Sequence, residues 1–140
     1  FFGLGTICYS WSKLSIPFTF FALVKLIIFL ITASFIMAAM QTAAAATCFW
    51  IMNSFYILDL SLKLKDYAKY PITIYNGLFK FIFTFIFPVA FIAYYPSQVI
   101  LKPDNVPLLS WLSPLIGIGL FYLSYKFWMK GASKYDGSGS

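Results

Sequence analysis

The chain of 140 residues contains no histidine, no glutamate and no arginine. Without histidine it has no imidazole to activate a serine or cysteine nucleophile, and it lacks the commonest metal-ligating side chain. Its acidic residues are four aspartates, and their positions predict no paired acid and base. We therefore expect a chain that is not an enzyme and that holds neither a metal nor a cofactor of its own.

Cysteine is also scarce. Cys8 and Cys48 lie in apolar surroundings, and their spacing matches neither a CxxC motif nor a disulfide framework. Each is expected to be a buried and unreactive thiol.

Charge is the third scarce property. Only 10% of the residues are charged and 61% are hydrophobic, whereas a soluble domain has roughly a quarter of its residues charged. The net charge of +6 comes from lysines scattered among apolar segments. A nucleic-acid-binding surface instead gathers its cations on one face, usually with arginine. The expected partner is therefore the lipid bilayer, and not nucleic acid.

Three apolar segments are long enough to cross a bilayer, which takes about 20 residues in a helix. They cover about 20–46, 74–95 and 108–128, and 1–10 resembles the end of a preceding span. The expected fold class is all-α, a polytopic transmembrane helical bundle that forms one domain over 1–140. Because the chain starts inside an apolar segment, we expect it to be the C-terminal part of a longer protein.

The first long segment has two interpretations. No glycine or proline lies between Phe18 and Asp59 to form a tight hairpin. One span over about 20–46, continued by an interfacial helix over about 50–70, is therefore preferred to two spans within 15–58. The stretch AAMQTAAAAT in the middle of this apolar segment is rich in alanine and threonine and predicts close approach of a neighbouring helix.

The segment 74–95 carries phenylalanine at every second position from Phe79 to Phe87, as a strand would. The residues between them are also mostly apolar, so the alternation defines no polar face, and the length favours a helix. Pro88 is expected to kink this helix. Three prolines within 96–107 predict a loop.

The segment 50–70 mixes apolar residues with lysine and aspartate at helical spacings. It predicts an amphipathic helix lying on the membrane surface, ended by Pro71. Placing this helix and the tail 130–140 in the cytosol puts seven lysines inside and three outside, in agreement with the positive-inside rule. Gly117 and Gly119 predict a close-packing surface on the last span.

Three stretches then resemble a known family. They are YAKYPITIY, FIFPVAFIAYYPSQVIL and the ending FWMKGASKYDGSGS. Together they are similar, over roughly 11–140, to the C-terminal half of ABC-2 type transporter permeases. The resemblance implies a six-span subunit of the plasma membrane with a cytosolic C-terminus. It would pair with a second permease subunit, in a homo- or heterodimer, and with ATP-binding subunits that hydrolyse ATP.

The resemblance also implies a substrate pathway, used for export, along the seam between the permease subunits. The candidate pathway residues are Gln41, Phe83, Phe87 and Tyr94. Each also has a plainer interpretation, as a packing residue, an interfacial anchor or, for Gln41, a single interhelical hydrogen bond. Contacts with the ATPase, or with anionic headgroups, are expected from Lys63, Lys65, Lys69 and Tyr70.

A membrane protein not driven by ATP, either a small channel or an accessory subunit, is the alternative function. A channel should show a polar face repeated along a span, and no segment shows one. The sequence contains no GxxxxGK[ST] phosphate loop, so ATP would be bound by a partner subunit.

Overall fold

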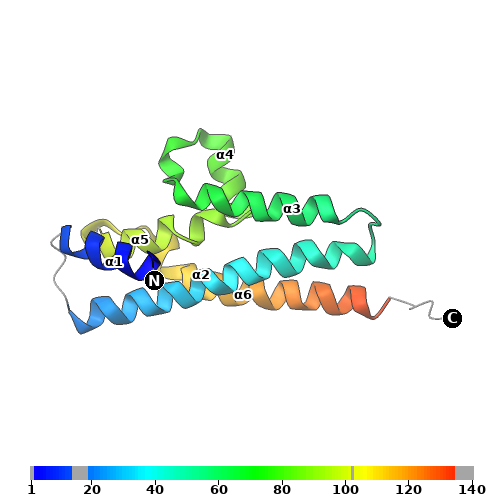
Figure 1. The fold of residues 1–140 in the computed structure, drawn as a ribbon, viewed down its shortest axis with the longest axis horizontal. Coiled ribbons are helices and arrows are strands. Elements are labelled where there is room, and N and C mark those ends of the chain that lie inside the picture. Colours follow the sequence, from blue (N-terminus) through cyan, green and yellow to red (C-terminus); the bar gives the residue numbers. More distant parts are fainter. Residues whose placement is uncertain (1, 14–18, 102, 135–140) are drawn as a thin grey trace.

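A computed structural model describes residues 2–13, 19–101 and 103–134. The described residues contain helices and turns but no strand, so the prediction of an all-α fold is confirmed. The α-helices are α1 (Phe2–Lys13), α2 (Phe20–Ala46), α3 (Phe55–Leu64), α4 (Gly77–Phe81), α5 (Tyr94–Leu101) and α6 (Leu108–Ala132). Figure 1 shows that α2 and α6 lie along the long axis of the molecule.

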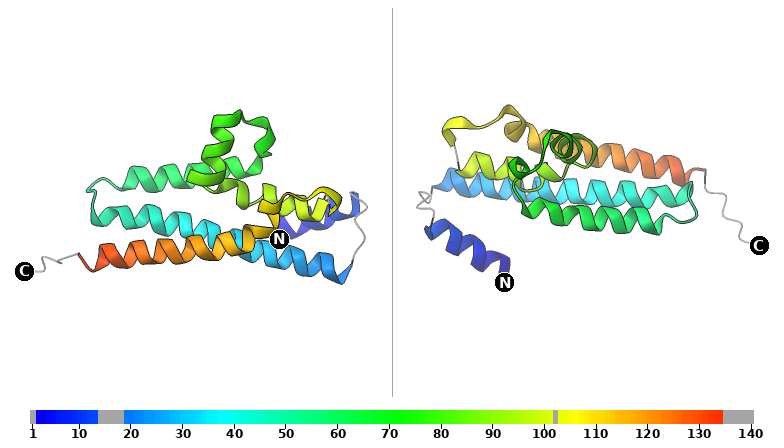
Figure 2. Two further views of the ribbon diagram at one scale, coloured as in Figure 1. Left: turned by 180° about the vertical axis from the view of Figure 1, so that it is seen from behind. Right: turned by 90° about the horizontal axis from the view of Figure 1, so that it is seen from above.

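Helices α2 and α6 run side by side in the same direction (Figures 1 and 2). Three contacts in ascending order along both helices establish this direction. The Lys25 ammonium lies 5.4 Å from the centre of the Trp111 ring, the rings of Phe35 and Phe121 are 5.3 Å apart, and those of Phe49 and Trp128 are 5.1 Å apart. The two longest helices therefore form a parallel pair.

Small residues form the face of α6 that packs against the rest of the bundle. The buried residues of this helix recur every three, four or seven positions and are Ser110, Ser113, Gly117, Ser124 and Gly131. A Cβ atom on Gly117 would lie 3.1 Å from Cγ2 of Thr32 on α2, whereas one on Gly119 would meet no atom within 4 Å. Close packing is thus confirmed at Gly117, and its prediction at Gly119 is wrong because that residue faces outward.

Helix α3 folds back along the C-terminal half of α2 (Figure 1). The sequence predicts an interfacial helix over about 50–70, but α3 is shorter and is followed by a 3₁₀-helix at Lys65–Lys69. Ser61 and Leu64 are its buried residues, and with Ile57 they form one stripe at helical spacing that faces α2 and the adjoining segments. Tyr70 is extended before Pro71, so the predicted end of this helical segment is confirmed.

The segment predicted as one span over about 74–95 consists of two helical parts. Gly77–Ile86 and Val89–Leu101 are bent by 74° relative to one another. The bend falls at Pro88, which has no N–H to continue the helix, so the predicted kink is confirmed and amounts to a break. Ile82–Ile86, just before it, is a π-helix. The loop predicted to start at 96 is instead helical to Leu101, because Pro96 lies in the first turn of α5, where its missing N–H costs nothing.

Two described helices, α2 with its 3₁₀ extension to Phe49 and α6, are long and apolar enough to cross a membrane. The bent pair would make a third crossing if it acts as one span. Because α2 and α6 are parallel, the chain between them must return from one side of a bilayer to the other when both of them cross it. This return consists of α3, which folds back along α2, the broken segment after it and α5.

A helix lies near each end of the described chain, and both cysteines lie on its surface. The segment 1–10, expected to end a preceding span, lies largely in α1, a helix of 12 residues. Of the predicted tail 130–140, the first three residues end α6, and 135–140 lie outside the described residues. Both cysteines are exposed, so the prediction of buried thiols is wrong. In a chain with an apolar exterior, apolar neighbours in sequence do not imply burial.

A serine compensates for the proline inside α6. Pro114 has no N–H to donate to the carbonyl of Ser110, four residues before it. The Ser113 hydroxyl donates to that carbonyl instead, at 2.7 Å, and both serines are fully buried. The hydroxyl therefore satisfies a backbone acceptor that water cannot reach.

We expect Ser113→Ala to lower the free energy of unfolding by about 1–2 kcal/mol, because it leaves a buried carbonyl without a donor. In a Pro114→Ala background the same substitution should cost much less, since an alanine at this position restores the backbone donor. Unfolding of the four variants in detergent micelles measures the coupling. Equal costs of Ser113→Ala in both backgrounds would contradict this explanation.

Candidate functional site

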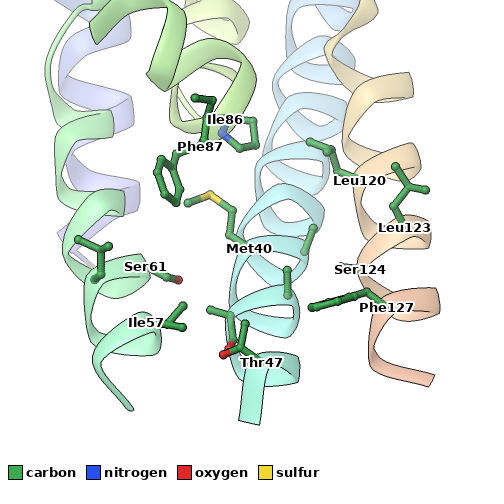
Figure 3. Close-up of a pocket in the computed structure, with 15 residues that line it drawn as sticks. Met40, Thr47, Ile57, Ser61, Ile86, Phe87, Leu120, Leu123, Ser124 and Phe127 are labelled. Carbon is green, nitrogen blue, oxygen red and sulfur yellow. The ribbon is translucent and has the colours of Figure 1, made fainter. Parts of the chain in front are cut away.

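An apolar groove of about 440 Å³ lies among the described residues. Its base is the alanine-rich part of α2, its two walls are α3 and α6, and the break at Pro88 closes one end (Figure 3). The base consists of Ala39, Met40, Ala43 and Ala44. Ala39, Ala44 and Ala46 are buried where α3 and α6 approach α2, so the predicted close approach of neighbouring helices is confirmed, and the small alanine side chains also leave space for the groove between the two walls.

The groove contains three polar side chains and no charged one. The Thr47 hydroxyl donates to the carbonyl of Ala44 at 2.6 Å, and the Ser124 hydroxyl donates to that of Phe121 at 2.8 Å. The Ser61 hydroxyl is buried and has no hydrogen-bond partner among the described residues. It points toward the interior of the groove in Figure 3.

A separate cluster of aromatic rings surrounds Phe83, outside the groove. The ring of Phe83 stacks on Tyr67 at 5.4 Å between centres and meets Tyr75 edge-on at 4.9 Å. Only 6% of Phe83 is exposed. The space lined by these rings and Tyr94 is about 10 Å³, barely enough for one water molecule and too small for a substrate.

Local ion pairs engage two of the basic residues at the end of α3 and in the 3₁₀-helix after it. Lys63 Nζ lies 2.6 Å from Asp59 Oδ2, and Lys69 Nζ lies 2.9 Å from Asp66 Oδ1. The hydrogen bond from Lys69 and its positive charge lower the pKa of Asp66, and the same pair raises the pKa of Lys69. All four side chains are solvent-accessible, so the pairs add little to stability.

A family model described as ABC-2 family transporter protein matches residues 1–139. The chain belongs to the ABC-2 transporter family. The family is a membrane component of ABC transporters, so this chain is a multi-pass membrane protein with a permease role. No curated protein and no solved structure matches it.

The structure of this ABC-2 family chain does not bring the four predicted pathway residues together. Phe87 lines the groove, whereas Phe83 and Tyr94 line the small aromatic space. Gln41 lines neither, and its amide nitrogen is buried without a hydrogen-bond partner among the described residues. The interhelical hydrogen bond that was the plainer interpretation of Gln41 is therefore not formed through this nitrogen.

The four residues predicted to contact an ATPase or headgroups lie on the segment that leads from α3 to Pro71. Lys63 and Lys69 carry the ion pairs described above, and Lys65 and Tyr70 are exposed. Tyr70 also borders the small aromatic space. The segment thus presents exposed positive and aromatic side chains, with part of its charge balanced locally.

Sequence reasoning missed Ser61 and the walls of the groove. Ser61 lies between two leucines in an amphipathic pattern, where a serine is usually taken as part of the polar face. Its position four residues after Ile57 and three before Leu64 is the signal that places it on the buried stripe. The partner helices of that stripe, α2 and α6, follow only from the tertiary fold.

Proposed function

We propose that this chain is the C-terminal half of a permease subunit that exports an apolar or amphipathic substrate. The match of the ABC-2 transporter model to residues 1–139 is the observation that carries the proposal. Partner subunits bind and hydrolyse ATP, in line with the absence of a phosphate loop from this sequence. The permease lies in the plasma membrane, with the C-terminal ends of α2 and α6 on the cytosolic side.

The substrate route in this proposal runs along the seam with a second permease subunit. Apolar side chains cover much of the exterior of the described chain, including Ile27, Ile31, Leu115, Ile118 and Leu123, which are each 47–69% exposed. These surfaces suit lipid or a neighbouring subunit, and they suit an apolar or amphipathic substrate better than a charged one. Of the four predicted pathway residues, Phe87 gives this proposal the most support because it lines the groove of about 440 Å³.

Co-purification and vesicle transport test the proposed function. The permease in its full length should co-purify with an ATP-hydrolysing subunit, and reconstituted vesicles should move a fluorescent amphipathic dye only when ATP is present. A variant of the ATPase that binds ATP without hydrolysing it provides the control. Dye movement that is independent of ATP, together with the absence of an ATPase partner, would contradict the proposal.

A further inference from the structure

The groove between α2, α3 and α6 has the size and chemistry of a ligand site. Its volume of about 440 Å³ lies in the range typical of small-molecule pockets. Twelve of its fifteen lining residues are apolar, and the remaining three carry hydroxyl groups. A ligand that fits this lining is mainly hydrocarbon and carries no charge inside the groove.

The buried hydroxyl of Ser61 points to a ligand that also contains an oxygen acceptor. Only 5% of Ser61 is exposed, and its hydroxyl has no partner among the described residues. The other two hydroxyls in the groove already donate to backbone carbonyls. Buried polar groups are nearly always hydrogen-bonded, so the unpaired hydroxyl of Ser61 indicates a missing partner. The oxygen itself is covered in this conformation, and a rotation about the Cα–Cβ bond turns it toward an acceptor in the groove that Ser61 lines. An ester carbonyl within a hydrocarbon environment provides such an acceptor.

The edge of the groove shows where the ligand enters. The lining residues Leu60, Ile86, Leu123 and Phe127 are 49%, 58%, 62% and 39% exposed. They lie on α3, α6 and the end of the π-helix, so the groove opens sideways between these elements (Figure 3). In a chain whose long helices cross a bilayer, that flank lies at membrane depth, and wherever it is open to lipid an acyl chain reaches the groove without passing through water.

From these three observations we infer that the groove binds one ester-linked acyl chain, whose carbonyl accepts a hydrogen bond from Ser61. The break at Pro88 closes one end of the site with Phe87, and the alanines of α2 leave room for the methylene chain. The inference concerns a binding site within this chain, and it holds whether or not transport is driven by ATP. A membrane phospholipid and a single-chain fatty ester share the required chemistry.

Photocrosslinking tests the inference on the full-length permease in phosphatidylcholine vesicles. Two probes with a diazirine in the acyl chain are used, a phosphatidylcholine and a fatty-acid methyl ester. Labelled peptides identified by mass spectrometry should come from the groove walls, around Ala43, Leu60 and Leu123. Labelling by both probes shows that the acyl ester is sufficient, whereas labelling by the phospholipid alone identifies a membrane lipid as the ligand.

Three variants make the test specific. Ala43→Trp fills the base of the groove and should abolish labelling there, whereas Ala45→Trp, on the same helix but outside the lining, should not. Ser61→Ala keeps the volume nearly unchanged and should lower labelling about two- to tenfold, as expected for one hydrogen bond. If Ala43→Trp does not fold, the Ser61→Ala variant still tests the inference.

Two results would overturn the inference. The first is labelling that is equal in the wild-type chain, Ala43→Trp and Ser61→Ala, which would show general contact with lipid. The second is a groove without label in the assembled transporter, which would show that another helix of the complex fills it. Neither result depends on transport activity, so the inference and the proposed function can fail separately.

Discussion

Phe83→Ala is expected to lower the free energy of unfolding by about 3–5 kcal/mol, the usual cost of removing a buried aromatic side chain. The ring of Phe83 fills the centre of the cluster formed with Tyr67, Tyr75 and Phe79. Its loss leaves a cavity beside the break in the helix, inside the buried cluster that joins Phe83 to Val89, Ala90 and Phe91 on the other side of the break. Chemical unfolding in detergent micelles, followed by tryptophan fluorescence, measures this change.

Phe85→Ala is the matched control on the same π-helix. Phe85 is 64% exposed, and its substitution should change the free energy of unfolding by no more than about 0.5 kcal/mol. The pair also separates the two interpretations of Phe83. A residue of the substrate pathway would lose transport when replaced while stability stayed unchanged, and that outcome would contradict the packing role.

Gly131→Leu is expected to destabilise the parallel pair of long helices by about 3 kcal/mol, the upper end of what overpacking usually costs. A Cβ atom on Gly131 would lie 2.8 Å from Cγ of Phe49 and 2.9 Å from Cη2 of Trp50. These rings also pack against Trp128 and Phe127 of α6, at 5.1 and 4.8 Å between centres. Moving them opens the contact between the C-terminal ends of α2 and α6.

Gly119→Leu tests whether this effect belongs to the position and not to leucine itself. A Cβ atom at Gly119 meets no other atom within 4 Å, and leucine favours helix over glycine by somewhat under 1 kcal/mol. Gly119→Leu should therefore leave the thermal midpoint unchanged or raise it, while Gly131→Leu lowers it. A similar fall of the thermal midpoint in both variants would show that the destabilisation does not come from the aromatic rings beside Gly131.

The extent of the two long helices could be predicted from the sequence because hydropathy alone determines it. The predicted span over 20–46 has the bounds of α2, and α6 extends four residues beyond the predicted end at 128. A kink at Pro88 was also predictable, since a proline cannot donate to the helical ladder, but its extent, a break between two helical parts, was not. Local chemistry settles each of these features without knowledge of the partner helices.

The partners of each helix face could not be predicted in the same way. Gly117 and Gly119 look alike in sequence, and only the register of α6 against Thr32 distinguishes them. The alanines at 39, 43 and 44 predict close helix packing, which is confirmed, but the groove that they also line was not predictable because it requires α3 and α6 to approach α2 from two sides. The register of two helices and the shape of a groove depend on several segments at once, so they cannot be predicted from any single segment.

The parallel pairing of α2 and α6 has a consequence for biosynthesis. Their contacts join residues about 80 positions apart, such as Phe35 with Phe121, so neither helix can complete its packing until nearly the whole described chain has been made. At about 5–20 residues per second, α2 waits several seconds in the membrane for its partner. During that interval its alanine-rich face is open to lipid and to chaperones. Assembly of this chain is therefore most vulnerable before α6 is inserted.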